Sequence, residues 1–292
     1  KAFLHQPPSD NYAYNYDQIV SYGELFSTWI VSNYLQENEV INEWLDARKL
    51  ISTSSHFQEA RVNWKKSREK IRVKTNSNSS IFISQGFIGG DANKNTTTLG
   101  REGSDYSAAI FAWAIDAEEL TIWKDVPGLL NADPKVFKDT HKIDHISYKE
   151  AIELSYYGAS VIHPKTIKPL QNKSIPLTIK SFINFQKIGT EINNDAEKDD
   201  ENTSFIYKPN QVLISISPKD YSFILEDHMS ELFRIFASTG LKVHLMQNSA
   251  LSFSVCAHIK QPLIPKLLNA LSEKYLVKYN EKVDLLTIRH YK

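Results

Sequence analysis

Residues 96–105 combine side chains that could bind a small charged molecule. The segment holds Arg101, Ser104 and Asp105 among threonines and glycines, and it leads into an apolar helical pattern. Hydroxyls and the N–H groups at a helix start bind anions, and Arg101 can hold a carboxylate through two parallel hydrogen bonds. Asp105 could hold an ammonium. This combination fits an amino acid, although glycine-rich turns from strand to helix also occur in many nucleotide- and metabolite-binding folds.

A second polar segment, residues 123–135, follows a predicted strand. Ligands of parallel sheets usually bind at the ends of such strands. Asp125 could accept a hydrogen bond from a ribose or an adenosine, and Lys135 could meet a phosphate as a point charge. The alternative is a pair of linked turns without a ligand.

Strands and helices alternate around these two segments. A strand at 81–83 runs into a region that contains most of the glycines, and an apolar helix follows from 104 or 105 to 115. A strand at 120–123 comes next. Ser147 and Glu150 form a capping box for a helix that ends at Gly158. With a strand at 175–179, this order predicts an α/β layer fold with a largely parallel sheet that closes near residue 192.

Two helices precede the glycine-rich region. Residues 17–35 carry apolar side chains at helical spacing, which predicts a helix that buries the face formed by Ile19, Tyr22, Phe26, Trp29 and Ile30. Residues 57–74 predict a second helix with a basic surface. No aromatic residues are interleaved there at stacking spacing, so we expect a solvated face rather than a nucleic-acid site.

The C-terminal part has a different order of elements. Residues 193–206 are highly charged and are expected to be a linker that does not order itself. Beyond them, two strand–helix–strand patterns predict a ferredoxin-like βαββαβ arrangement. A further strand begins at 283–289.

The composition excludes several classes of protein. The 292 residues carry 34 basic and 34 acidic side chains, so no overall charge attracts nucleic acid. The mean hydropathy is −0.37, and no apolar stretch approaches the roughly 18 residues of a membrane span. Cys256 is the single cysteine, which excludes an internal disulfide and a multi-cysteine zinc site. A reducing compartment, the cytoplasm, is therefore expected, and residues 1–10 do not resemble a signal peptide.

Several ordered motifs together resemble the aspartate kinases. They are residues 22–25, 44–48, 85–89, 97–109, 125–128, 132–134 and 158–164. The resemblance implies an αβα-sandwich amino-acid kinase domain (1–192, incomplete at its N-terminus), a linker (193–206) and an ACT regulatory domain (207–292) with a second ACT unit starting at 283–292. It also implies ATP-dependent phosphorylation of the L-aspartate β-carboxylate to 4-phospho-L-aspartate, the first step toward lysine, threonine and methionine.

The resemblance also assigns site residues. The aspartate site falls on Glu24, Phe87, Arg101, Ser104 and Asp105. The ATP site falls on Lys124, Asp125, Leu130, Lys135, Ser160 and Val161, with Mg²⁺ held through the phosphates and no dedicated metal site. Asn248 and Ser249 lie where the family binds its effector, expected to be lysine or threonine. Pairing of ACT units implies a homodimer or a larger assembly.

Some positions depart from the family pattern. Lys124 stands where threonine is common, Leu130 replaces a tyrosine, Lys135 an arginine and Ser160 a lysine. His244 replaces an acidic residue of lysine-sensing relatives. The family's loop with the catalytic lysine is not found in residues 1–17, which keeps open a catalytically silent, effector-binding regulatory subunit. Another amino-acid kinase is the remaining alternative.

Overall fold

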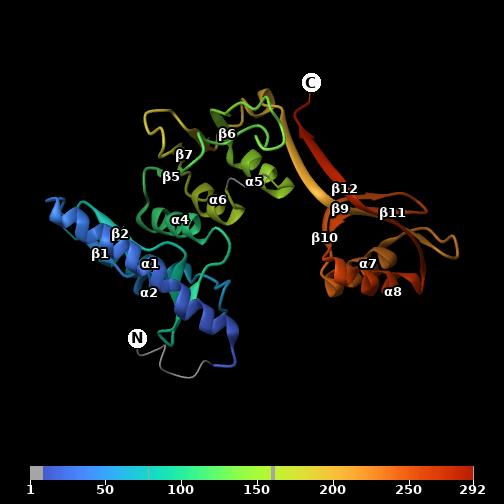
Figure 1. The fold of residues 1–292 in the computed structure, drawn as a ribbon, viewed down its shortest axis with the longest axis horizontal. Coiled ribbons are helices and arrows are strands. Elements are labelled where there is room, and N and C mark those ends of the chain that lie inside the picture. The colour runs from blue at the N-terminus through green and yellow to red at the C-terminus, as the bar shows by residue number, and fades with distance from the viewer. Residues whose placement is uncertain (1–8, 78, 159–161, 292) are drawn as a thin grey trace. The chain divides into compact units, whose positions relative to one another are not determined.

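The computed structural model describes residues 9–77, 79–158 and 162–291 (Figure 1). The chain divides into two compact units. The first comprises residues 1–130 and 141–202, and the second comprises residues 131–140 and 203–292. The chain therefore passes from one unit to the other after Leu130, after Thr140 and after Asn202.

The first unit is a mixed α/β structure. Its described elements are α1 (Tyr12–Glu37), β1 (Glu43–Leu45), α2 (Ala47–Leu50), α3 (Trp64–Thr75), β2 (Phe82–Ser84), β3 (Ile88–Gly90), β4 (Thr96–Thr98), α4 (Gly103–Ile115), β5 (Leu120–Lys124), β6 (His145–Ser147), α5 (Tyr148–Tyr157), α6 (Pro164–Gln171), β7 (Leu177–Ser181), β8 (Thr190–Asn193) and a 3₁₀ turn (Asp199–Glu201). The predicted helices and strands are present, but the helix expected at 57–74 begins only at Trp64. The sequence did not predict seven further elements, β1, α2, β3, β4, β6, α6 and β8.

The strands of this unit form three small sheets. The pair β1–β2 is parallel and the pair β3–β4 is antiparallel. The third sheet has the order β5-β7-β8-β6, in which two parallel pairs meet at the antiparallel pair β7–β8. The expectation of a largely parallel sheet is therefore correct for the outer pairs β5–β7 and β6–β8. It is wrong for the central pair β7–β8, which is antiparallel. Helix α4 packs against α3 and α6, and its residues Ile110 and Ala114 join a buried apolar cluster with Ile71 and Ile88.

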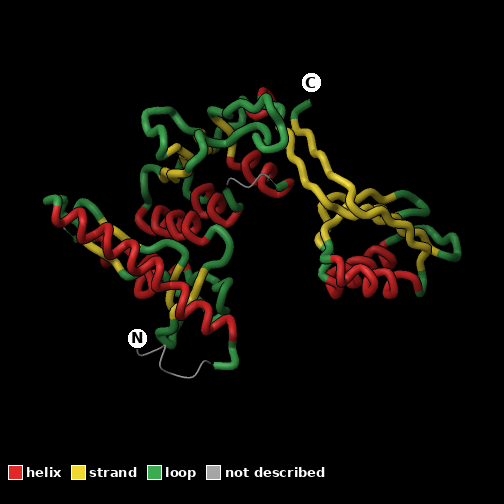
Figure 2. Tube along the Cα trace, viewed as in Figure 1, coloured by secondary structure: helices red, strands yellow, loops and turns green. Residues whose placement is uncertain are grey.

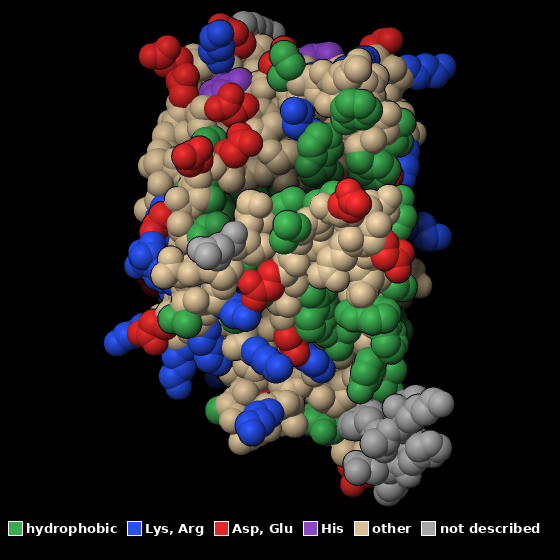
Figure 3. Space-filling model, turned by 90° about the vertical axis from the view of Figure 1, so that its left-hand side faces the viewer, with side chains coloured by type: hydrophobic (Ala, Val, Ile, Leu, Met, Phe, Trp, Pro, Cys, Tyr) green, Lys and Arg blue, Asp and Glu red, His purple; other side chains and the backbone are tan. Residues whose placement is uncertain are grey.

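The apolar face of α1 differs from the prediction. Ile19, Phe26 and Trp29 are 50%, 61% and 55% exposed, and the side chains that α1 buries are Asp17, Ser21, Leu25 and Ser32. Hydrophobic side chains gather in a band on the face drawn in Figure 3. The buried face of α1 is mostly polar, and its side chains form hydrogen bonds with the rest of the unit. The spacing of the apolar residues therefore predicted the helix correctly but predicted the wrong buried face.

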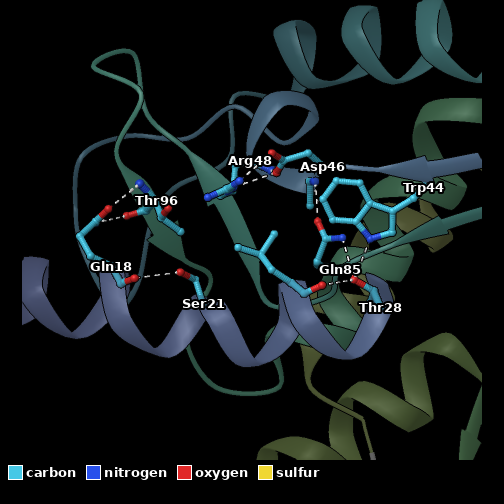
Figure 4. Close-up of polar contacts among 10 residues, drawn as sticks. Gln18, Ser21, Thr28, Trp44, Asp46, Arg48, Gln85 and Thr96 are labelled. Atoms are coloured by element: carbon cyan, nitrogen blue, oxygen red, sulfur yellow. Dashed lines mark hydrogen bonds and ion pairs between the residues drawn. The ribbon is translucent and has the colours of Figure 1, made fainter. Parts of the chain in front are cut away.

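Hydrogen bonds attach α1 to the strands. Thr28 Oγ1 accepts hydrogen bonds from Gln85 Nε2 (2.8 Å) and Trp44 Nε1 (3.1 Å), and Gln85 Oε1 accepts one from the backbone N–H of Ala47 (2.8 Å) (Figure 4). About three helical turns closer to the N-terminus, the Gln18 amide donates to the carbonyl of Thr96 (2.7 Å) and accepts from its N–H (3.1 Å). These contacts fix the position of α1 relative to β2 and β4.

A buried carboxylate completes this attachment. Asp17 is fully buried, and its Oδ2 accepts hydrogen bonds from the backbone N–H groups of Gln58 (3.0 Å) and Thr98 (2.9 Å). Its Oδ1 accepts a hydrogen bond from Thr98 Oγ1 (2.8 Å). A carboxylate buried in this way is stabilised only by its donors. Asp17 therefore joins α1, the loop at residue 58 and β4 into one body.

Residues 193–206 do not form the disordered linker expected from their charge. Asp199 is buried and accepts hydrogen bonds from the backbone N–H and the hydroxyl of Ser147 (2.8 and 2.5 Å). Ser147 caps α5 as predicted, by accepting from the N–H of Glu150, and Gly158 ends the helix in the left-handed conformation. The N–H of Ser147, which a capping box would give to Glu150, bonds Asp199 instead.

The second unit has the ferredoxin-like arrangement. Its elements are β9 (Ser204–Pro218), α7 (Glu226–Thr239), β10 (Lys242–Asn248), β11 (Phe253–His258), a 3₁₀ turn (Gln261–Leu263), α8 (Ile264–Ser272) and β12 (Tyr275–Arg289). The strand order is β10-β11-β9-β12, all antiparallel, and both helices cover one face of the sheet (Figure 1). Residues of α7, α8 and the strands form its apolar core.

Residues 283–289 are the end of β12 and not a separate strand. They pair with the first residues of β9, so β9 and β12 run on together as a ribbon beyond the rest of the sheet (Figure 2). The expected start of a new unit at residue 283 is therefore a continuation of the fourth strand. No helix among the described residues is both long and apolar enough to cross a membrane.

Asp17→Ala should lower the free energy of unfolding by about 3 kcal/mol, because it leaves buried backbone N–H groups without an acceptor. Asp17→Asn should cost less, since one oxygen remains. Urea unfolding followed by circular dichroism measures both. The control is Asp10→Ala, at an exposed position before α1. A loss as small as that of the control would contradict the anchoring role of Asp17.

Candidate functional site

A cavity of about 680 Å³ opens in the first unit where α1, β4 and the start of α4 come together. It is lined by Tyr12, Tyr16, Gln58, Glu59, Phe87, Thr98, Gly100, Arg101, Glu102, Gly103, Ser104 and Asp105. The Asp17 hydrogen bonds hold two of these lining segments, because Gln58 and Thr98 are its backbone donors. The cavity contains carboxylates, a guanidinium, hydroxyls and aromatic rings. Such a lining suits a small molecule that carries both charges.

Phe87 is held in place by the backbone around it. It adopts a left-handed conformation (φ 70°), its N–H donates to Ser107 Oγ (2.9 Å), and its carbonyl accepts from the N–H of Leu99 (2.8 Å). A Cβ on Gly103 would lie 2.6 Å from the Phe87 ring, so glycine is required for this close packing. The ring is thereby fixed against the first turn of α4.

The first turn of α4 supplies the polar groups. Glu102 is the residue before the helix, in the left-handed conformation (φ 54°, ψ 34°), and its side chain makes no capping hydrogen bond. The N–H groups of a first helical turn have no acceptor within the helix and favour anions. Arg101 and Ser104 are exposed beside them. A carboxylate bound here would meet a guanidinium, a hydroxyl and the helix start.

Asp105 forms an ion pair with Lys124. The Lys124 Nζ and Asp105 Oδ2 atoms are 3.0 Å apart, and the side chains are 24% and 18% exposed. Lys124 is the last residue of β5, and Asp125 follows it in an exposed turn. The pair therefore links the predicted amino-acid site on α4 with the first residues of the predicted nucleotide segment.

Four of the five residues assigned to the aspartate site lie together in the cavity: Phe87, Arg101, Ser104 and Asp105. Glu24 is not among the lining residues. It is half-buried on α1, where burial raises the pKa of its carboxyl group. The sequence motif at 97–109 thus located the cavity, while the motif at 22–25 marks a neighbouring part of α1.

The described residues assigned to the ATP site belong to both units. Lys124 and Asp125 lie at the end of β5, and Leu130 forms a bridge with Lys142 in the first unit. Lys135 belongs to the segment 131–140 of the second unit, in a turn closed on Asp133. Ser160 and Val161 lie outside the described residues.

His163 is close enough to the cavity for the charges of Arg101 and Glu102 to affect its pKa. It caps α6 by accepting, through Nδ1, from the N–H of Lys165 (3.1 Å). Burial lowers the pKa of His163, and the charges of Lys165 and Arg101 also lower it, while that of Glu102 acts in the opposite direction. His163, near the end of the motif at 158–164, therefore interacts electrostatically with Arg101 and Glu102.

The predicted effector residues lie in the hairpin between β10 and β11. Asn248 ends β10, and Ser249 closes the turn through bonds to the carbonyl and hydroxyl of Ser252 (2.9 and 2.8 Å). Both residues are exposed. His244, on the same strand, lies 3.0 Å from Lys208 Nζ, and burial, followed by the charge of Lys208, lowers its pKa.

Sequence reasoning missed part of the cavity. Tyr12, Tyr16, Gln58 and Glu59 line it from segments without a recognisable motif, and Asp17 holds two of those segments. Glu102 lies inside the quoted motif, but its conformation could not be read from residue types. In the part of the chain that the structure describes, no group of three or more histidine, cysteine or acidic side chains could hold a metal ion.

The cavity lies at the start of α4 in a mixed α/β unit, and its charged lining suits a small-molecule-binding protein. A sequence model of the amino acid kinase family matches residues 4–181, and the chain belongs to this family. It is 34% identical to the lysine-sensitive aspartokinase 3 of Escherichia coli over 82% of the chain, which spans 54% of that relative. It is 32% identical to an aspartokinase of Chlamydia muridarum over the same share, and spans 55% of it.

A solved structure shows the same similarity in three dimensions. The chain superposes on E. coli aspartokinase III in complex with aspartate and ADP, in its R-state, with a TM-score of 0.77 and 31% identity. The match covers 96% of this chain and 64% of that one. The chain thus spans between 54% and 64% of the length of the aspartokinases named here.

Gly103→Ala should lower the free energy of unfolding by roughly 1–3 kcal/mol, because the added Cβ would collide with Phe87. Gly23→Ala is the matched control. No atom lies within 4 Å of its added Cβ, and alanine favours a helix by about 1 kcal/mol, so this change should stabilise α1. Thermal unfolding compares the two. Equal effects would show that the Phe87 contact is not tight.

Proposed function

We propose that the chain carries the aspartate-binding part of an aspartate kinase, which transfers the γ-phosphoryl group of ATP to the β-carboxylate of L-aspartate. The observation that carries the proposal is the gathering of Phe87, Arg101, Ser104 and Asp105 around one cavity. Membership of the amino acid kinase family and similarity to named aspartokinases support the same reaction.

Each cavity residue has a role in this proposal. Arg101 holds a substrate carboxylate as a bidentate partner, and Ser104 with the first turn of α4 adds neutral donors. Phe87 forms an apolar wall that limits the length of the substrate. Phosphoryl transfer depends mainly on position and on charge stabilisation, so a site that fixes the acceptor carboxylate supplies much of the catalysis.

The nucleotide belongs beside the end of β5. Asp125 offers an acceptor for a ribose or adenosine, and Lys124 offers a cation within 3.0 Å of Asp105, between the two substrates. A hydrogen-bond acceptor and a cation together fit a nucleoside triphosphate, whose ribose donates hydrogen bonds and whose phosphates are negatively charged. Mg²⁺ would be held by the phosphates, where it neutralises charge on the transferred group.

The second unit is proposed to be an ACT regulatory domain. Its ferredoxin-like order of strands supports this, and the exposed turn at Asn248 and Ser249 is the proposed effector contact. E. coli aspartokinase III has been solved in complex with lysine and aspartate in a T-state, which supports lysine as the effector to test first. Threonine is the comparison. Pairing of such units would make the protein a homodimer, which sedimentation equilibrium measures as twice the monomer mass.

The decisive experiment is ADP release that depends on L-aspartate, with hydroxylamine added to trap the acyl phosphate. Aspartyl hydroxamate should form with L-aspartate and not with L-glutamate. Hydroxamate formed equally well from glutamate would assign another amino-acid kinase. If ADP release is absent while lysine or threonine still binds, the protein acts instead as a regulatory subunit.

Arg101→Ala should raise the KM for aspartate by about tenfold or more and leave the KM for ATP nearly unchanged, because the lost guanidinium contacts only the amino acid. Coupled ADP release at varied aspartate measures this. Arg61→Ala, at an exposed position in the same unit, is the control. Unchanged aspartate kinetics in Arg101→Ala would refute the assignment of the carboxylate site.

Lys124→Met should lower kcat by about tenfold or more, since it removes a cation from the region between the substrates. Steady-state kinetics with both substrates at saturation separate this effect from weaker binding. Lys65→Met, an exposed change on α3, controls for the altered net charge. If Lys124→Met keeps the wild-type kcat, Lys124 has no catalytic role and only forms the ion pair with Asp105.

A further inference from the structure

The turn at residues 125–128 carries Asp125, which the proposed function places against the nucleotide. Asp125 is exposed, so the position of its carboxylate depends on how the two ends of the turn are held. At the first end, Lys124 pairs with Ser181 in the sheet. The carbonyl of Lys124 also accepts a hydrogen bond from the N–H of Phe182 (3.0 Å). Strand pairing therefore fixes the residue that precedes Asp125.

The hydroxyl of Thr190 holds the second end of the turn. Thr190 is fully buried, and its Oγ1 accepts a hydrogen bond from the N–H of Leu129 (2.8 Å). The same hydroxyl donates to the carbonyl of Ile143 (2.5 Å), while the N–H of Ile143 donates to the carbonyl of Leu129 (2.9 Å). One buried hydroxyl thus satisfies backbone groups on two segments, and its removal would leave both groups without a partner.

Gly128 packs directly against this hydroxyl. A Cβ on Gly128 would lie 2.5 Å from Thr190 Oγ1, and the residue adopts φ 145°, a conformation that favours glycine. Only glycine lets the turn approach Thr190 this closely. A hydrogen bond and a close backbone contact therefore both set the turn against the same side chain.

The topology of the sheet places Thr190 at the edge where ligands bind. Thr190 is the first residue of β8, which runs antiparallel to β7, while β7 runs parallel to β5. The amino end of β8 therefore lies at the same edge as the carboxyl ends of β5 and β7. Thr190 pairs with Ile179, which pairs in turn with Ile122, two residues before Lys124. Ligands of such sheets bind outside the carboxyl ends of the parallel strands.

We infer that Thr190 is a positioning residue for the nucleotide, whose hydroxyl holds the turn at 125–128 so that Asp125 can meet the ligand. Thr190 is fully buried and acts through Gly128 and Leu129 rather than by touching the nucleotide. It also lies outside every motif on which the resemblance rests. The inference depends on the proposed function, and it adds to that function a residue that determines the affinity for the nucleotide.

The test separates the hydroxyl from the rest of the side chain. Thr190→Val keeps the shape and removes the hydroxyl, so it should raise the KM for ATP and the Kd for ADP by roughly tenfold, because a displaced turn no longer fits the ligand. The KM for aspartate should change by no more than about twofold. Thr190→Ser keeps the hydroxyl and loses a buried methyl group. It should unfold at a lower temperature and still keep the wild-type values for both nucleotides.

Steady-state kinetics give the two KM values, isothermal titration of the 292-residue protein with ADP gives the Kd, and thermal unfolding gives the stability. Thr178→Val is the matched control. It makes the same substitution at a half-buried position on β7 and should leave nucleotide binding unchanged. Gly128→Ala decides the question if Thr190→Val does not fold, because the added Cβ pushes the turn away from an intact hydroxyl. It should raise the KM for ATP in the same way, and an unchanged KM would overturn the inference.

The outcomes separate this inference from the proposed function. A folded Thr190→Val that keeps the wild-type KM for ATP and Kd for ADP overturns the role of Thr190 and leaves the kinase proposal standing. The role is also overturned if Thr190→Ser impairs nucleotide binding as much as Thr190→Val, or if the KM for aspartate rises equally, because either result indicates general structural damage. A wild type that neither releases nor binds ADP refutes the proposed function, and the role of Thr190 fails with it.

Discussion

The buried carboxylate of Asp17 is the constraint on which the first unit depends. A charge taken out of water needs donors, and here two backbone N–H groups and one hydroxyl provide them. Those donors belong to the loop at Gln58 and to β4, which are separate walls of the cavity. One desolvated group therefore sets the distance between α1 and the segments that face it. The aromatic rings of Tyr12 and Tyr16, on the same helix, take their positions in the cavity from this attachment.

The cavity brings together charges that are compensated to different degrees. Asp105 has Lys124 beside it, whereas the buried oxygen of Glu102 has no donor among the described residues. Arg101 remains exposed at the cavity wall. Electrostatic stabilisation of this kind acts through groups held in place before the ligand arrives, and the close packing of Phe87 against Gly103 helps to hold the first turn of α4 in place.

The sequence predicted helices and strands better than it predicted which of their side chains are buried and which contacts they form. Local signals identified α4, the Ser147 cap, the end of α5 at Gly158 and the ferredoxin-like order, because each depends on neighbouring residues alone. The prediction of the buried face of α1 was wrong, because the spacing of Phe26 and Trp29 shows which side of the helix is apolar but not which side packs against the protein. Asp199 made an apparent linker into ordered structure through a partner far away in sequence. The motif at 97–109 located the cavity. The left-handed backbone of Glu102 and its buried oxygen could be found only from the structure.

The interleaving of the two units has a consequence for synthesis on the ribosome. Residues 131–140 emerge with the first unit but find their partners in the second, where the N–H of Phe205 donates to the carbonyl of Asn131 (2.8 Å) and the Phe205 ring lies 5.8 Å from that of Phe137. This loop must wait, unpaired, until β9 leaves the exit tunnel. A nascent chain halted before residue 203 would lack the Phe205 ring that Phe137 contacts. Because the chain crosses between the units three times, a single cut cannot separate them.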